Sequence, residues 1–341
     1  MATSGQASAT SAAGVPAAAR PIVFLLGRGR TGTTWIGQIL NRHPDCQYKY
    51  EPFNPGKEPE FDRWLRDLAT GDRQELARRF DDLCGRCFHA VDYPPFLRKS
   101  CRPQSPLLLR AFWQLGKLVP ATQGIYRWYG RPRLGPGSWT LIKQVNFPNE
   151  RLQRLVEVVS PWIVAIIRNP FASVNSALRF YRGEAIRTPE NIARNLELLP
   201  TLPPPGLRVT AAELAAMSDA AFEAVRWRVQ SEPLAAFAAA YPAGIVIRYE
   251  DFADAPLETA RAVYRFLGWS FDPSIASFIA ATTAGRRPTL QSQERSQFSI
   301  HRDPQEAKKR WQKDLSPRQV EEIRQVVGES SLMELWPELA V

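Results

Sequence analysis

The 341-residue sequence predicts an α/β fold in which a central, mostly parallel sheet is flanked by helices. Apolar runs typical of buried strands occur at residues 22–26 and 162–167, and residues 140–146 also suit a strand. Stretches with helical spacing follow these runs, and a glycine-rich turn at residues 27–32 joins the first run to the first helix. Strands that alternate with helices pair in parallel and are covered on both faces, so one sheet between two helical layers is expected.

The turn at residues 27–32 is predicted to hold a phosphate. The helix that follows it ends at His43-Pro44, as expected before a proline. The first N–H groups of a helix have no acceptor inside the helix, and here they point into the turn. Charged and hydroxyl side chains add further donors: Arg28, Arg30, Thr31, Thr33 and Thr34.

Two general phosphate-binding patterns match this turn. Gly27-x-Gly29-x-x-Gly32 satisfies a dinucleotide fingerprint, and Glu51 follows at about the distance of a ribose-binding acid. The same glycines followed by Thr33 also form a P-loop whose lysine is replaced by threonine. This replacement argues against ordinary ATP or GTP hydrolysis, because the missing lysine contacts the β- and γ-phosphates.

The run Arg30-Thr31-Gly32-Thr33-Thr34-Trp35 resembles the 5′-phosphosulfate loop of the sulfotransferase family. Members of this family have a P-loop-like, three-layer fold and use no metal. They move a sulfuryl group from phosphoadenosine phosphosulfate (PAPS) to an acceptor. The resemblance implies that PAPS is the co-substrate and 3′-phosphoadenosine 5′-phosphate (PAP) the product. It also assigns co-substrate binding to Arg28, Arg30, Thr31, Gly32, Thr33, Thr34 and Trp35.

A second stretch is similar to the 3′-phosphate motif of the same family. Arg168-Asn169-Pro170 follows the strand predicted at residues 162–167, and Ser176 comes eight residues after Arg168. An arginine at the end of a strand and a hydroxyl two helical turns later can hold one phosphate between them. The alternative is a strand-to-helix turn with a surface arginine.

Two further stretches resemble family segments near the nucleotide. The strand that begins at Gly244 ends in Tyr249-Glu250-Asp251, and the family's tyrosine at this place lies near the adenine. Residues 298–304 and 310–316 resemble the C-terminal segment that flanks the nucleotide. The resemblance therefore adds Tyr249, Arg310 and Trp311 to the expected co-substrate site. The last helix is predicted to begin at Pro317, with Ser316 as its N-cap and Gln319 closing a capping box.

Sulfuryl transfer needs a base for the acceptor hydroxyl and positive charge for the leaving 5′-phosphate. Arg30 is the candidate for the charge, and Glu51 is the candidate base. In sulfotransferases that use a glutamate base, the glutamate follows a His-Pro-Asp turn, here His43-Pro44-Asp45. Lys143 is expected to stabilise the transferring group or to contact the acceptor. His89 and His301 are alternative bases, because cytosolic relatives often use histidine.

Composition limits the partners and the location. The formal net charge is +10, but the arginines are scattered, so we expect a negatively charged co-substrate rather than nucleic acid. No apolar run is long enough to cross a membrane. Residues 1–19 lack the features of a secretory signal, which predicts a disordered tail and a cytoplasmic protein. Residues 20–341 are predicted to form one domain, with 54–139 as a helical cap that binds the acceptor.

Cys84 and Cys87, with Cys101 and His89 nearby, raise the question of a zinc site or a disulfide. Their spacing supplies no second pair of ligands, so free thiols are the default. The function predicted is sulfuryl transfer from PAPS, without metal, to a hydroxyl of a carbohydrate, glycolipid or small molecule. Three alternatives stay open: a P-loop small-molecule kinase, a non-catalytic nucleotide-binding protein and a dinucleotide-dependent dehydrogenase.

Overall fold

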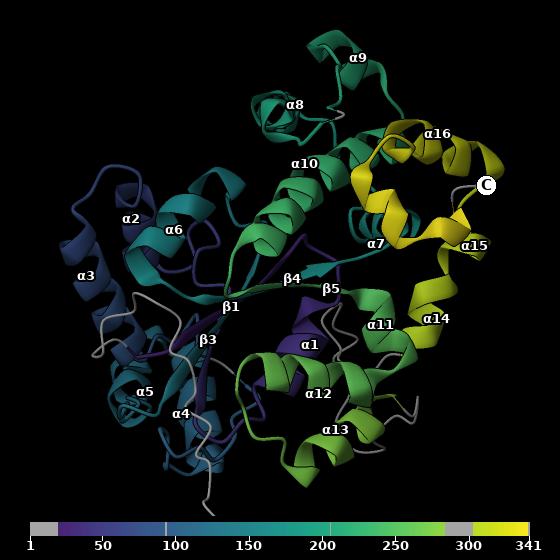
Figure 1. Ribbon diagram of the computed structural model, residues 1–341. Helices are drawn as coiled ribbons and strands as arrows, with labels where there is room; N and C mark the ends of the chain where they lie inside the picture. The colour runs from purple at the N-terminus through teal and green to yellow at the C-terminus, as the bar shows by residue number, and fades with distance from the viewer. Residues whose placement is uncertain (1–19, 93, 205, 284–302, 340–341) are drawn as a thin grey trace, which may run out of the picture.

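The computed structural model describes residues 20–92, 94–204, 206–283 and 303–339 (Figure 1). Its strands form one parallel sheet in the order β2-β3-β1-β4-β5. The strands are β1 (Ile22–Gly27), β2 (Cys46–Tyr50), β3 (Trp139–Val145), β4 (Trp162–Ile167) and β5 (Gly244–Arg248). The predicted α/β fold with a central parallel sheet is therefore confirmed.

Helices cover both faces of this sheet (Figure 1). Successive side chains of a strand point to opposite faces, so Phe24 and Leu26 of β1 join one core cluster and Val23 and Leu25 join the other. The first cluster includes α2 (Pro59–Asp67), α3 (Arg73–Gly85), α6 (Leu152–Val159) and part of α10 (Asp219–Ala240). The second includes α1 (Thr33–Leu40), α11 (Tyr249–Asp254), α12 (Pro256–Phe266) and α13 (Pro273–Thr283).

A third cluster extends the core beyond the end of the sheet, around Trp227 and Trp336. It joins α10 to α7 (Pro170–Phe180), α8 (Pro189–Leu198), α9 (Ala211–Ala216) and α16 (Pro317–Val327). The remaining helices are α4 (Pro106–Leu118), α5 (Gln123–Tyr129), α14 (Pro304–Lys309) and α15 (Trp311–Asp314). Short 3-10 turns occur at Pro120–Thr122, Asn149–Arg151, Leu199–Thr201, Ser331–Leu335 and Pro337–Leu339. None of the described helices combines the length and apolar character that a membrane span requires.

Several boundaries differ from the sequence prediction. Within the helical cap expected at 54–139, α2 and α3 are separate helices, because Asp72 accepts a hydrogen bond from the Glu75 backbone N–H and starts a new helix. The later part of the same segment contains α4 and α5. Their periodicity is hard to recognise because part of their exposed surface is apolar. The capping box at the start of α16 is confirmed.

The sheet topology predicts where a ligand should bind. From β1 the chain passes to β2 at one edge of the sheet, and from β4 it passes to β5 at the other edge. β1 and β4 are neighbours, so the connections that leave their carboxyl ends diverge. Open parallel sheets bind ligands in the crevice at such a switch point. The glycine turn after β1 and Arg168 after β4 both lie there.

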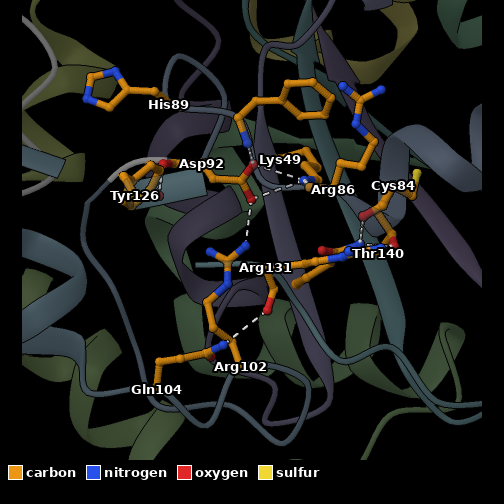
Figure 2. Close-up of polar contacts among 12 residues, drawn as sticks. Lys49, Cys84, Arg86, His89, Asp92, Arg102, Gln104, Tyr126, Arg131 and Thr140 are labelled. Atoms are coloured by element: carbon orange, nitrogen blue, oxygen red, sulfur yellow. Dashed lines mark hydrogen bonds and ion pairs between the residues drawn. The ribbon is translucent and has the colours of Figure 1, made fainter. Parts of the chain in front are cut away.

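A buried charge network ties β2 to the segment that carries α4 and α5. The Asp92 carboxylate accepts hydrogen bonds from Lys49 at 2.9 Å and from Arg102 at 2.8 Å, and all three side chains are buried (Figure 2). The Tyr126 hydroxyl of α5 donates to the Asp92 carbonyl. Burial alone would raise the pKa of Asp92, but Lys49 and Arg102 outweigh it and hold the pKa below its usual value.

Asp92→Asn should lower the free energy of unfolding at pH 7 by about 3–5 kcal/mol, because two buried cations lose their counter-charge. The folded-state pKa of Asp92 lies below the unfolded value of about 3.9. The stabilisation is therefore present above about pH 4 and is lost as the pH falls through the folded-state pKa. Urea unfolding from pH 7 to pH 3 should show this loss in the wild type and a flatter profile in the variant.

Asp82→Asn is the matched control, because the Asp82 side chain is 65% exposed and its ion pair with Arg86 is 3.6 Å long. Its cost should be at most about 1 kcal/mol. Equal losses in the two variants would show that the buried network does not stabilise the fold.

Candidate active site

The turn after β1 has a backbone that favours glycine at one position. Gly32 has a φ of 85° and forms the N-cap of α1, and Arg30 also has a positive φ, of 74°. A Cβ atom on Gly32 would lie 2.4 Å from the Tyr249 ring. Asn146 accepts a hydrogen bond from the Gly29 backbone N–H at 2.8 Å, and this contact ties the turn to the end of β3. The turn is thus held in one shape, with the opening N–H groups of α1 beside it.

Arg168 joins three of the predicted motifs. Its Nη1 donates to the Arg30 carbonyl at 2.9 Å, and its Nη2 donates to the Ala307 carbonyl of α14 at 2.7 Å. The guanidinium lies over the Tyr249 ring, with Cζ 4.5 Å from the centroid. Arg168 Nε is buried and has no hydrogen-bond acceptor among the described residues. A buried N–H without a partner is costly, so an acceptor on a ligand would satisfy it.

Arg30 and Ser176 bring the two phosphate motifs side by side. Arg30 Nε donates to Ser176 Oγ over 3.5 Å, and the guanidinium lies 4.8 Å from the Phe180 ring centroid. Ser176 and Phe180 are both on α7, the helix that follows Arg168. The arginine that precedes α7 and the serine on it therefore face the turn after β1, as the family spacing implies.

Glu51 and Lys143 form an ion pair where the neighbouring strands β2 and β3 end. Lys143 Nζ donates to Glu51 Oε1, and Asn54 donates to Glu51 Oε2 at 2.6 Å. The Glu51 backbone adopts a φ of 48° and donates its N–H to the Lys143 carbonyl at 2.7 Å. Burial lowers the pKa of Lys143, and the adjacent Glu51 carboxylate opposes this shift.

These groups line one cavity of about 390 Å³, a volume within the range of small-molecule sites. The predicted residues that line it are Arg28, Arg30, Gly32, Thr33, Thr34, Trp35, Glu51, Lys143, Arg168, Ser176 and Tyr249. The structure thus gathers segments from all five strand ends and from α7 around a single site.

Some predicted residues lie elsewhere or point elsewhere. The Arg28 guanidinium is buried against Glu223 and donates to Ser173 Oγ at 2.9 Å, so it supports the turn from behind. Thr31 is fully buried, and its hydroxyl donates to the Arg28 carbonyl at 2.7 Å.

Arg310 and Trp311 do not line the cavity, in contrast to the expectation. Arg310 pairs with Glu306 one helical turn earlier. Trp311 stacks on Phe171, with ring centroids 4.9 Å apart. The Trp311 contact holds α15 against α7, because Phe171 belongs to α7.

Of the alternative bases, His89 lies outside the cavity. It stacks on Trp113 with centroids 5.4 Å apart, and Figure 2 shows its ring directed away from Asp92. His301 and the similar segment at 298–302 fall outside the described residues. The four cysteines are free and buried, and no group of three or more potential metal ligands occurs within the described parts of the chain.

Other residues that line the cavity were not predicted. Asn54 and Asn146 follow β2 and β3, while Arg226 and Gln230 come from α10. The position of Asn146 at the end of a predicted strand was a usable signal, whereas α10 approaches the site only through tertiary packing. Of the described residues in 54–139, Asn54 alone lines the cavity, so an acceptor-binding role for that segment stays a prediction.

No known protein-family profile matches the chain. It is 26% identical over 305 residues to human carbohydrate sulfotransferase 6, an alignment that covers 79% of this chain and 69% of that protein. This relative is a sulfotransferase, in agreement with the family that the motifs of the chain resemble. The kinase alternative is accordingly not favoured.

Solved sulfotransferase structures are similar to the chain at low sequence identity. Mouse sulfotransferase SULT7A1 complexed with PAP is 15% identical, with a TM-score of 0.47 and coverage of 94% of this chain and 90% of that one. The sulfotransferase domain from the curacin biosynthetic pathway is 14% identical, with a TM-score of 0.47 and coverage of 90% and 96%. Sulfotransferase STF9 from Mycobacterium avium is 16% identical, with a TM-score of 0.40 and coverage of 94% and 78%.

Gly32→Ala should weaken PAP binding by about tenfold or more, because the new Cβ must displace the turn or the Tyr249 ring, and overpacking costs about 1–3 kcal/mol. Gly56→Ala is the matched control. Gly56 also has a positive φ, of 73°, but its Cβ would meet no atom within 4 Å. Isothermal titration should find normal PAP affinity in the control. Normal affinity in Gly32→Ala would show that the close approach to Tyr249 has no role in binding.

Proposed function

We propose that this protein is a sulfotransferase that takes its sulfuryl group from PAPS and transfers it to a hydroxyl of a carbohydrate, glycolipid or other small molecule. The observation that carries the proposal is the position of Arg168. This guanidinium contacts the turn after β1, stacks on Tyr249 and leads into the helix that carries Ser176. The two phosphate motifs therefore share one cavity, and a nucleotide phosphorylated at both the 3′ and 5′ positions would engage both.

The residues present fit such a nucleotide. The N–H groups of Thr33 and Thr34 open α1, where an anion such as a 5′-phosphate is stabilised. The unpaired Nε of Arg168 and the Ser176 hydroxyl would bind the 3′-phosphate. Tyr249 lines the same cavity, and the adenine would lie near it.

In the proposed reaction, the acceptor oxygen attacks sulfur while the bond from sulfur to the 5′-phosphate oxygen breaks. The acceptor proton passes to Glu51, and PAP leaves with the electron pair of the broken bond. Each carboxylate oxygen of Glu51 keeps a lone pair beyond its contact with Lys143 or Asn54. Arg30 and Lys143 supply positive charge beside the transferring group, which in this proposal replaces a metal ion.

A polyhydroxylated acceptor is favoured by the lining of the cavity. The amides of Asn54, Asn146 and Gln230 can each donate and accept hydrogen bonds. The relative named above, a carbohydrate sulfotransferase, supports the same class of acceptor.

Arg168→Gln should abolish the preference of the protein for PAP over ADP. In the wild type, PAP should raise the melting temperature more than ADP does, because only PAP carries a 3′-phosphate. The variant should lose about 1.5–3 kcal/mol of PAP binding, the scale of a charged hydrogen bond. Arg179→Gln removes an exposed arginine of α7 that pairs with Asp314, and its PAP binding should be normal. An unchanged ratio of PAP to ADP affinity in Arg168→Gln would refute the assignment.

Glu51→Gln should reduce the sulfuryl-transfer rate by roughly 10²–10⁴, the usual contribution of a general base, and should hardly change PAP affinity. Glu60→Gln is the control, because the Glu60 side chain pairs with Arg86 on the surface of α2. Near-normal turnover of Glu51→Gln would place the base elsewhere, and lost PAP binding would make Glu51 a co-substrate or folding residue.

A further inference from the structure

The exposed large hydrophobic side chains of the described residues all lie within residues 107–128. The most exposed are Leu107 at 80%, Leu118 at 78% and Trp128 at 78%, and the others are Leu108, Leu115, Val119 and Ile125. Exposed large apolar side chains that are concentrated in one short segment, rather than scattered singly, are typical of an interaction surface. We call residues 106–129, which comprise α4, the turn after it and α5, the α4–α5 hairpin.

The apolar side chains of α4 form one stripe along the helix. Residues 107, 111, 115 and 118 are spaced by three or four, so they fall within roughly 100° of arc. Arg110 and Lys117 occupy the arc beside this stripe, whereas Leu109 and Gly116 are buried on the opposite side. The exposed side of α4 is therefore an apolar stripe with cations along one of its sides.

The buried side of the hairpin is fixed to the rest of the protein. Trp113 donates its indole N–H to the His89 carbonyl at 3.1 Å, and Phe112 packs against Tyr129 with centroids 5.1 Å apart. The Tyr126 hydroxyl contacts Asp92 of the buried charge network (Figure 2). These contacts hold α4 and α5 together, and Figure 1 shows both helices at the lower left, at the edge of the molecule. The apolar stripe is thus displayed by a rigid support.

The segment around the hairpin carries charge of one sign. Residues 93–138 contain eight Lys and Arg residues and no Asp or Glu. Lys99 and Arg102 are buried. Arg127 lies close enough to Glu58 and Glu60 of the α2 region for its charge to act toward a lower pKa in both. The remaining exposed cations are Arg98, Arg110, Lys117, Arg131 and Arg133.

We propose that the α4–α5 hairpin docks the protein on an anionic lipid bilayer. Leu107, Leu118 and Trp128 enter the interface between headgroups and acyl chains, and the surrounding cations contact anionic headgroups. A second copy of this chain fits less well, because two such faces would oppose like charges with no acid between them. No residue of the hairpin lines the cavity described above, so this inference does not depend on the proposed function.

Vesicle co-sedimentation tests the proposal with the full chain. Vesicles of phosphatidylcholine with phosphatidylglycerol should bind the protein at least about tenfold more strongly than phosphatidylcholine alone. Added salt should reduce this binding, because it screens the headgroup charge. The triple variant Leu107→Gln/Leu118→Gln/Trp128→Gln should lose it. Since these side chains are exposed, the melting temperature of the variant should stay near that of the wild type.

Two double variants that remove the same net charge show whether vesicle binding depends on the cations of the hairpin or on the net charge of the protein. Arg110→Gln/Lys117→Gln should reduce vesicle binding by about tenfold. Arg208→Gln/Arg265→Gln removes two exposed arginines elsewhere and should leave binding unchanged. The proposal is overturned if neither kind of vesicle binds, or if the two charge variants lose equal binding. It is also overturned if light scattering shows a dimer that the triple variant dissociates, since a second copy would then cover the face.

Discussion

The candidate active site depends on one guanidinium, that of Arg168. It leaves the end of β4, donates to the backbone of the turn after β1 and to α14, and stacks on Tyr249 after β5. Four segments that are distant in the sequence are thereby held together. The parallel sheet makes this arrangement possible, because the carboxyl ends of its strands meet at one edge.

Buried carboxylates hold the cations of this edge in place. Glu223 of α10 is fully buried and pairs with both Arg28 and Arg226. Glu250 is also buried, and it accepts hydrogen bonds from the Asn169 backbone N–H at 3.1 Å and from the Trp336 indole at 3.2 Å. Its carboxylate also interacts electrostatically with Arg168. Burial raises the pKa of Glu250, and Arg168 opposes that shift. Buried acids thus hold in place the arginines that line the cavity.

Local features of the sequence predicted much of the fold and part of the site. The strand, turn and helix at residues 22–40 depend on short-range pattern, as does the spacing of Arg168 and Ser176, so both could be found without tertiary information. Arg226 and Gln230 reach the cavity only because α10 packs across the sheet, which no local pattern reveals. Arg310 and Trp311 lie outside the cavity lining, since Arg310 pairs with Glu306 and Trp311 packs on Phe171, and the similarity of their segment does not reveal these contacts. The α4–α5 hairpin was missed because its exposed apolar stripe obscures the usual division into polar and apolar faces.

The central claim is that one cavity holds a nucleotide by both of its phosphates. A crystal structure of the protein with PAP tests it most directly. The account predicts the 5′-phosphate against the N–H groups of Thr33 and Thr34, the 3′-phosphate against Arg168 and Ser176, and the adenine near Tyr249. PAP bound outside this cavity, or with its 3′-phosphate in solvent and Arg168 still on the carbonyls of Arg30 and Ala307, would contradict it.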